Sequence, residues 1–176
     1  GRPPNILIIL VDDMGYSDPG FLGGDIETPH LDRLAAEGTV FGRFTNHAKC
    51  EPSRASLMTG VHFQRQTHDH VTREFGNVTM MAERLRKAGY RTLATGKWHL
   101  PGKPTEHGFD RFFGLRGGAS NHFDPTGRLE LDPDLYLNRE LLLDGEPYTV
   151  ENGDFYTTKT FTDYALRFLE ETAPDE

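Results

Sequence analysis

The sequence predicts an α/β fold with a mixed, mostly parallel sheet flanked by helices. Two observations carry this prediction: the chain opens with a continuous apolar run, and strand-like and helix-like segments then follow in the order β-α-β-α-α-β. A strand buried on both faces reads as such an apolar run, and this alternation is typical of parallel sheets with helical crossovers.

The first three elements follow from local patterns. Residues 6–11 read Ile-Leu-Ile-Ile-Leu-Val and stop at two aspartates, which predicts a buried strand. Thr28 and Pro29 suit the N-cap and first position of a helix that Gly38 ends. Residues 39–46 are expected to form a second strand.

The next elements surround the single cysteine. Residues 52–59 are expected to form a short helix that begins just after Cys50 and ends at Gly60. Apolar residues at helical spacing predict another helix over residues 81–88, and residues 90–95 are expected to form a third strand.

The C-terminal third is less regular. Residues 100–134 are rich in Gly, Pro, Asn and Asp, which predicts a long loop, and residues 134–150 suggest a hairpin turning at Asp144-Gly145. A last helix presents one apolar face formed by Phe161, Tyr164, Ala165 and Phe168. Three predicted strands are few for a sheet of this type, so we expect the fold to be incomplete in this chain.

Composition excludes some classes of function. The net charge is −8 and no Lys/Arg-rich run is present, which argues against a nucleic-acid partner but still allows an anionic substrate. No segment approaches the ~18 apolar residues of a membrane span, and residues 5–11 are too short for a signal peptide, although a leader could precede Gly1. One cysteine cannot form an internal disulfide, so periplasmic and cytoplasmic locations both stay open.

The segment from Cys50 to Gly60 carries the most specific chemical signal. It reads Cys-Glu-Pro-Ser-Arg-Ala-Ser-Leu-Met-Thr-Gly and places a nucleophile at the start of a helix. Free N–H groups at a helix N-terminus favour an oxyanion or a deprotonated group, and Arg54 adds a fixed cation. An ordinary helix beside a buried cysteine fits the same local features.

The wider pattern decides between these interpretations. Cys50-x-Pro-x-Arg54, continued by Leu-Met-Thr-Gly60, resembles the signature of the type I sulfatases, in which the cysteine is oxidised to formylglycine. Residues 5–13, 89–99 and 117–122 are also similar to sulfatase segments, the last of them in bacterial arylsulfatases, and they occur in the expected order. The resemblance therefore covers almost the whole chain. Lys49 and Glu51 depart from the small or apolar residues usual beside this cysteine.

The resemblance implies an alkaline-phosphatase-like fold and the hydrolysis of sulfate esters by a formylglycine nucleophile with a divalent cation. It also implies that residues 1–176 are the N-terminal part of the catalytic domain, because family members are longer. The remaining C-terminal part is then a required partner that completes the metal site. We accordingly expect this chain alone to be inactive.

The resemblance assigns roles to individual residues. The implied site comprises catalytic Cys50, Arg54, Lys97 and His99, substrate-binding Lys97, Asn121 and His122, and metal-binding Asp12, Asp13 and Cys50. Calcium is the implied ion, with Mg²⁺ as the alternative. Asp12 and Asp13 leave the predicted end of the first strand, where α/β sheets place ligands, and Lys97 and His99 follow the third.

Several alternatives stay open at this point. His68-Asp-His70 suggests a second metal site, but no further ligand follows at a familiar spacing, and neither His47 nor His62 has a predicted role. The same nucleophile motif occurs in related phosphonate monoester and phosphodiester hydrolases. A non-catalytic binding fragment is the remaining interpretation.

Overall fold

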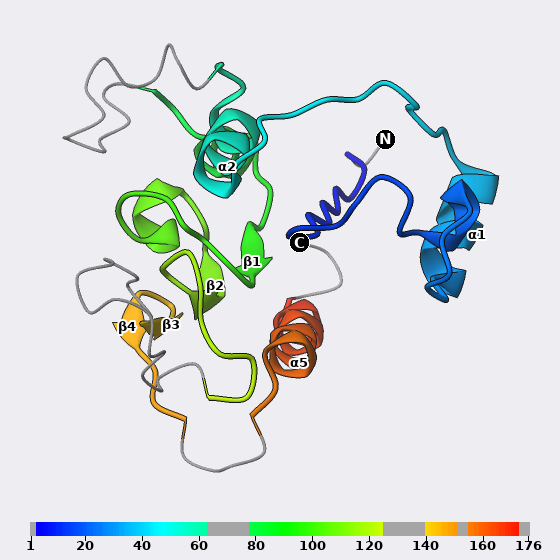
Figure 1. The fold of residues 1–176 in the computed structure, drawn as a ribbon. Coiled ribbons are helices and arrows are strands. Elements are labelled where there is room, and N and C mark those ends of the chain that lie inside the picture. Colours follow the sequence, from blue (N-terminus) through cyan, green and yellow to red (C-terminus); the bar gives the residue numbers. More distant parts are fainter. Residues whose placement is uncertain (1–2, 63–77, 125–139, 151–154, 173–176) are drawn as a thin grey trace. The chain divides into compact units, whose positions relative to one another are not determined.

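The structure is a computed structural model that describes residues 3–62, 78–124, 140–150 and 155–172 (Figure 1). It divides into two compact units, Gly1–Asn46 and His47–Glu176. The four-stranded sheet and the cysteine both belong to the second unit.

The first unit contains a 3-10 helix, η1 (Gly20–Leu22), and helix α1 (Pro29–Glu37). The predicted helix at Pro29 is thus confirmed. Thr28 does not cap its N-terminus with a side-chain bond; its hydroxyl instead donates to Asp32 Oδ1 at 2.7 Å and accepts from the N–H of Gly20 at 2.8 Å. Thr28 and Asp32 therefore tie η1 to the first turn of α1.

The prediction of two strands in this unit, over residues 6–11 and 39–46, is wrong. Residues 6–11 and 39–46 are irregular, and the six apolar side chains of residues 6–11 are between 42% and 83% exposed. A strand needs a hydrogen-bonded neighbour as well as apolar side chains. Among the described residues, no strand pairs with either segment.

The second unit contains the sheet and most of the helices. Its elements are α2 (Cys50–Thr59), α4 (Met81–Lys87), β1 (Leu93–Thr95), the 3-10 helix η2 (Pro104–His107), β2 (Arg111–Leu115), β3 (Leu141–Leu143), β4 (Glu146–Pro147) and α5 (Thr157–Glu170).

The sheet has the order β1-β2-β3-β4 and is mixed. β1 and β2 are parallel, whereas the β2–β3 and β3–β4 pairs are antiparallel. The α/β class with a mixed sheet and flanking helices is confirmed. In the part of the chain that is described, antiparallel pairs outnumber parallel ones, because a hairpin follows the single crossover from β1 to β2.

Several element boundaries differ from the sequence prediction. α2 begins at Cys50 itself and not after it, and it ends as predicted at Gly60, whose φ is 68°. The predicted loop over residues 100–134 contains η2 and β2, whose five residues occur among too many glycines and prolines for a clear strand pattern.

The hairpin is confirmed where it is described. Asp144 and Gly145 have φ of 53° and 91°, the left-handed pair that a two-residue turn between antiparallel strands requires. The Asp144 carboxylate also accepts hydrogen bonds from Phe112 N and Arg111 Nε, both at 2.9 Å. Residues 134–139 of the predicted hairpin lie outside the described residues.

Side chains of the sheet are buried on both faces. Phe112 and Leu142 belong to one apolar cluster, together with Ala55 of α2, Ala82 of α4 and Trp98. The opposite cluster contains Phe113, Leu115 and Leu141 from the sheet with Phe155 and Phe168, and Phe161 and Tyr164 pack against it. Helix α5 therefore covers one face, as Figure 1 shows, and α2 and α4 contribute to the other.

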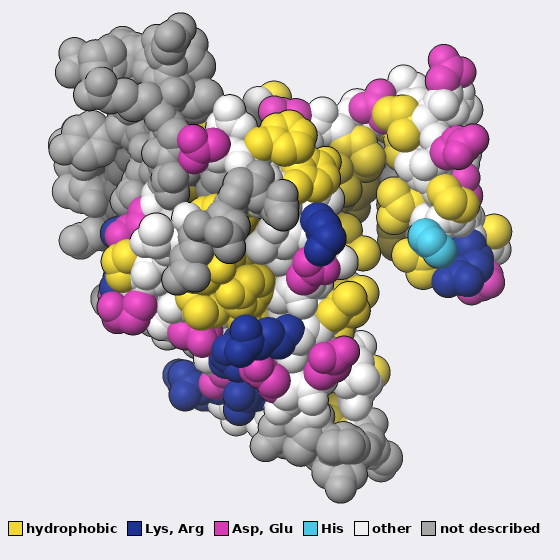
Figure 2. Space-filling model, turned by 90° about the horizontal axis from the view of Figure 1, so that it is seen from below, with side chains coloured by type: hydrophobic (Ala, Val, Ile, Leu, Met, Phe, Trp, Pro, Cys, Tyr) yellow, Lys and Arg dark blue, Asp and Glu magenta, His cyan; other side chains and the backbone are white. Residues whose placement is uncertain are grey.

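Charges on the surface are mixed. On the face drawn in Figure 2, Lys and Arg side chains lie beside Asp and Glu side chains, so positive charge is not gathered there into one basic surface. Within the described ranges, no helix combines the length and apolar character needed to cross a bilayer.

Candidate active site

Cys50 occupies the first position of α2 and is half-buried. The chain enters the helix through the extended residue Lys49, and the hydroxyl of Ser53 donates to the carbonyls of His47 at 2.7 Å and Lys49 at 2.8 Å. These bonds fix the entry to the helix, whose unpaired N–H groups and positive dipole end favour negative charge beside Cys50.

Arg54 lies one helical turn after Cys50 and on the same face of α2. Side chains four positions apart on a helix are neighbours, so Arg54 and Cys50 occupy adjacent positions on this face. Arg54 is only 8% exposed, and its Nη1 donates to the carbonyl oxygen of Lys97 at 2.5 Å. This bond joins the nucleophile helix to a segment 43 residues further along the chain.

The segment after β1 is held in place by the neighbouring strand. Trp98 N donates to the carbonyl of Leu115 at 2.8 Å, and His99 N donates to that of Arg116 at 3.0 Å. The Trp98 ring is 3% exposed and belongs to the same cluster as Ala55 of α2. Lys97 and His99 therefore flank a buried anchor and are both half-buried themselves.

His99 has a backbone conformation that is uncommon outside glycine. Its φ is 54°, and of the non-glycine residues described only Asp13 and Asp144 share a positive φ. Its ring packs directly on Gly118, where an added Cβ would lie 2.5 Å from Nε2. The sequence pointed to residues 117–122 only through a resemblance, and this contact is the physical reason for a glycine at position 118.

Asn121 and His122 follow in a loop that reaches the start of α5. Asn121 Oδ1 accepts from the backbone N–H of Phe123 at 2.8 Å and of Asp124 at 3.2 Å. His122 Nδ1 lies 2.7 Å from the hydroxyl of Thr157, and Thr157 N donates to the carbonyl of His122 at 2.9 Å. Sequence patterns gave no signal for Thr157, which is buried and orients His122.

The family assignment follows from a comparison that covers almost the whole chain. A family model described as Sulfatase matches residues 4–176.

This chain belongs to the sulfatase family.

Named relatives agree with this assignment. The chain is 32% identical to an arylsulfatase of Klebsiella aerogenes and 34% identical to a human N-acetylgalactosamine-6-sulfatase, and each match covers 98% of this chain. It covers only 40% and 37% of those two proteins. This sulfatase chain thus spans about two fifths of the length of the curated relatives it matches.

Solved structures also match most of this chain with only part of their own length. The crystal structure of Ps i-CgsB matches with a TM-score of 0.79 and 29% identity over 97% of this chain and 42% of that chain. A second structure of Ps i-CgsB, in complex with k-i-k-neocarrahexaose, matches with a TM-score of 0.68 and 25% identity over 91% of this chain and 40% of that one.

The structure brings some of the predicted sulfatase site together and leaves the rest untested. Cys50, Arg54, Lys97 and His99 lie in the second unit on two segments that hydrogen bond to each other. Asp12 and Asp13 belong to the first unit, where both are exposed. Their approach to Cys50 therefore stays a prediction.

Potential metal-ligating side chains do not gather into a cluster within the described ranges. No group of three or more His, Cys, Asp or Glu side chains lies there in a position to hold an ion. The predicted alternative site at residues 68–70 lies outside the described residues. His47 and His62, which had no predicted role, meet edge to face with ring centroids 4.7 Å apart.

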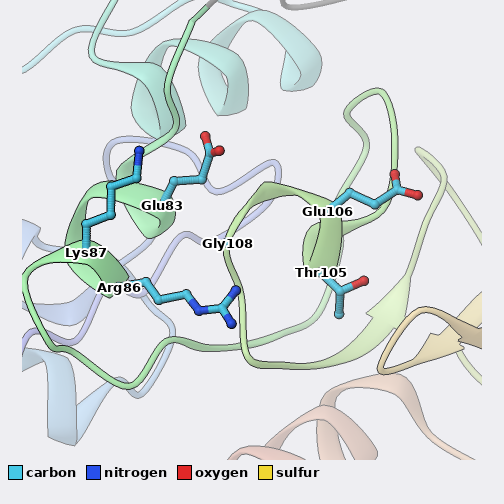
Figure 3. A pocket seen from close by; sticks show the side chains of 6 residues that line it. All are labelled: Glu83, Arg86, Lys87, Thr105, Glu106 and Gly108. Atoms are coloured by element: carbon cyan, nitrogen blue, oxygen red, sulfur yellow. The ribbon is translucent and has the colours of Figure 1, made fainter.

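A separate open cleft of about 340 Å³ lies between α4 and η2 (Figure 3). Its lining residues are Glu83, Arg86, Lys87, Thr105, Glu106 and Gly108. Arg86 also pairs with Asp110 at 3.1 Å, and Figure 3 shows its guanidinium directed toward the chain at Gly108. None of the predicted sulfatase site residues lines this cleft.

Proposed function

We propose that the protein containing this chain hydrolyses sulfate esters, with formylglycine derived from Cys50 as its nucleophile. The observation that carries the proposal is the hydrogen bond from buried Arg54 to the carbonyl of Lys97, within a family of sulfatases. Through this bond the helix that begins at Cys50 is attached to the segment of Lys97 and His99.

Charge complementarity supports a sulfuryl group as the reacting centre. Cleavage of a sulfate ester requires an in-line nucleophile and positive charge directed at the equatorial oxygens, as phosphoryl transfer does. Arg54 is a permanent cation at the nucleophile helix, and we assign Lys97 to the sulfate oxygens. The N-terminal dipole of α2 adds to this positive field.

His99 is assigned to the second half of the reaction. Hydrated formylglycine at position 50 would supply one hydroxyl to attack sulfur, and the proton of that hydroxyl would leave with the alcohol or phenol of the substrate. His99 would take the proton of the second hydroxyl, which would reform the carbon–oxygen double bond and release sulfate. An oxidised cysteine is needed because a serine ester has no such internal exit.

The donor set of the first unit fits a hard cation. Asp12 and Asp13 offer carboxylate oxygens, which Ca²⁺ and Mg²⁺ prefer, and we propose them as ligands together with an oxygen of modified Cys50. A divalent cation bound there would lower the pKa of the attacking hydroxyl and balance charge on the sulfuryl group. Calcium takes roughly 6–8 oxygens, so the remaining C-terminal part is proposed to supply further ligands.

The substrate is proposed to be a small sulfate ester, and a sulfated carbohydrate in particular. One relative is named for N-acetylgalactosamine 6-sulfate, and Ps i-CgsB is described in complex with a neocarrahexaose. Asn121 and His122 are proposed to contact the alcohol part of the substrate. Because His122 Nδ1 contacts the Thr157 hydroxyl, Nε2 is the ring nitrogen that we propose for the substrate.

The proposal is tested on the complete protein that contains this chain. Intact-mass analysis is expected to show oxidation at Cys50, and turnover of 4-nitrophenyl sulfate is expected to disappear in Cys50→Ala and Cys50→Ser. Full turnover by either variant contradicts the mechanism. A phenyl phosphonate ester tested in parallel separates a sulfatase from a phosphonate hydrolase, which would turn over the phosphonate faster.

A further inference from the structure

Two exposed aromatic rings lie side by side next to the proposed substrate contacts. Phe123 and Tyr156 stack with ring centroids 5.2 Å apart and an angle of 20° between their planes. Phe123 is 69% exposed and Tyr156 is 41% exposed. We call these two rings the aromatic platform.

The aromatic platform is held by backbone bonds on both of its segments. The turn at Asn121 fixes Phe123, because Asn121 Oδ1 accepts from its N–H. Tyr156 immediately precedes Thr157, whose N–H donates to the carbonyl of His122, so the loop and the start of α5 are tied together. Figure 1 shows the loop after β2 running to this end of α5. The rings are therefore pre-positioned and lose little freedom when a ligand binds.

The aromatic platform also lies within reach of the proposed catalytic residues. Gly118 touches the ring of His99, and His122 is four residues further along the chain. Four residues span at most about 14 Å even when fully extended. His122 itself lies 6.4 Å from Tyr156 between ring centroids. An oligosaccharide of several sugar rings bound at the platform would therefore be long enough to extend to His99.

Polar residues adjoin the two exposed rings in the sequence. Asn121, His122, Asp124 and Thr158 are exposed and lie within two residues of one ring or the other. They offer both donors and acceptors of hydrogen bonds. A pyranose ring has the matching chemistry, with an apolar C–H face that covers an aromatic ring and a rim of hydroxyl groups.

We propose that the aromatic platform of Phe123 and Tyr156 is a saccharide-binding subsite that stacks on a pyranose ring of a carbohydrate sulfate. This inference rests on the proposed function and extends it by naming the residues that select the substrate. It assigns the platform to binding and leaves the chemical step to Cys50, Lys97 and His99.

The experiment compares two substrates on the complete protein. Phe123→Ala and Tyr156→Ala are expected to raise KM for a sulfated neocarrahexaose by about tenfold, the size of one aromatic stacking contact. The value of kcat for 4-nitrophenyl sulfate is expected to stay at the wild-type level. Leu169→Ala is the matched control, because Leu169 is an exposed apolar residue (61%) at the other end of α5.

A binding measurement keeps the inference separate from the proposed function. In a Cys50→Ala background, the affinity for the same hexasaccharide is expected to fall about tenfold with either aromatic variant, whether or not the parent protein turns over sulfate esters. If the parent protein has no sulfatase activity but both aromatic variants still lose affinity for the hexasaccharide, the proposed function is refuted. The platform is then retained as a saccharide site.

Three outcomes overturn the inference. The first is unchanged affinity in both aromatic variants, and the second is no binding of the hexasaccharide by the parent protein. The third is a lower melting temperature with an equal loss of kcat on both substrates, which would mean that the rings pack against the rest of the protein.

Discussion

Both the backbone and the side chain of His99 are constrained in this structure. Its backbone adopts a positive φ, which costs a non-glycine residue of the order of 1 kcal/mol, and its ring lies against a glycine with no room for a methyl group. Strain of this kind persists where the surroundings over-determine a conformation, and it is common at functional sites. Asp13, the proposed metal ligand, shares the positive φ.

Gly118→Ala is therefore expected to reduce activity more than stability. The new Cβ would lie 2.5 Å from His99 Nε2, so the imidazole must move. If His99 acts as proposed, kcat for 4-nitrophenyl sulfate should fall about 10²-fold, as for a misplaced catalytic group. Gly42→Ala is the control, since nothing lies within 4 Å of a Cβ there. Wild-type kcat in Gly118→Ala would remove His99 from the mechanism.

At the scale of elements, the β1–β2 pair and its extension position the site. Gly96 N donates to the carbonyl of Phe113 at 2.9 Å, and Leu115 N donates to that of Gly96 at 3.0 Å. The two strands approach so closely at Gly114 that a Cβ on it would lie 1.9 Å from the carbonyl oxygen of Gly96. The position of Lys97 thus depends on a glycine in the neighbouring strand.

Gly114→Ala is expected to destabilise the second unit. The obstacle is backbone and cannot rotate away, so overpacking should lower the free energy of unfolding by about 3 kcal/mol. Urea unfolding of the 176-residue chain, followed by fluorescence, measures this loss, because Trp98 is the only tryptophan of that chain and lies in the affected cluster. An unchanged urea midpoint would show that β1 and β2 are further apart than described.

A second element contact predicts a dependence on pH. Hydrogen bonds from Arg167 and then Arg111 lower the pKa of Glu171, so the end of α5 is attached to β2 through a carboxylate. A folded-state pKa below the unfolded one contributes stability above the ordinary Glu range, and this stability is lost as pH falls through the lowered value.

Glu171→Gln is accordingly expected to reduce stability at neutral pH and to flatten its loss in acid. The measurement is the urea midpoint at neutral pH and at a pH of about 3, below the ordinary Glu pKa. Glu170→Gln, at the exposed neighbouring position, is the matched control. If the urea midpoints of wild type and Glu171→Gln change equally with pH, the Glu171 carboxylate is excluded as the source of the pH dependence.

At the scale of the whole molecule, we propose that this chain supplies only part of the site. Asp12, Asp13 and Cys50 offer fewer oxygens than calcium requires, and the chain spans about two fifths of the relatives it matches. The 176-residue chain expressed alone is therefore expected neither to bind Ca²⁺ tightly in calorimetry nor to hydrolyse 4-nitrophenyl sulfate. Turnover by the purified chain would refute the need for a C-terminal part.

The order of residues in the chain was enough to predict the family and the α/β class, and it suggested the residue types of the proposed site. Local chemistry was enough for α1, for the end of α2 at Gly60 and for the turn at Asp144-Gly145, because each depends on backbone preferences of a few neighbouring residues. The Cys50 signature could be recognised in the sequence because its residues are close together in the chain.

The pairing of segments and the meeting of distant side chains depended on tertiary contacts. The run over residues 6–11 has strand-forming residues but no paired strand among those described, whereas β2 formed inside an apparent loop because β1 and β3 supply its hydrogen bonds. The contacts of Arg54 with Lys97, Gly118 with His99 and Thr157 with His122 join residues that are distant in the sequence, by 43 positions in the first pair and 35 in the last. No local pattern records such contacts, since they follow from packing around Trp98 and the sheet.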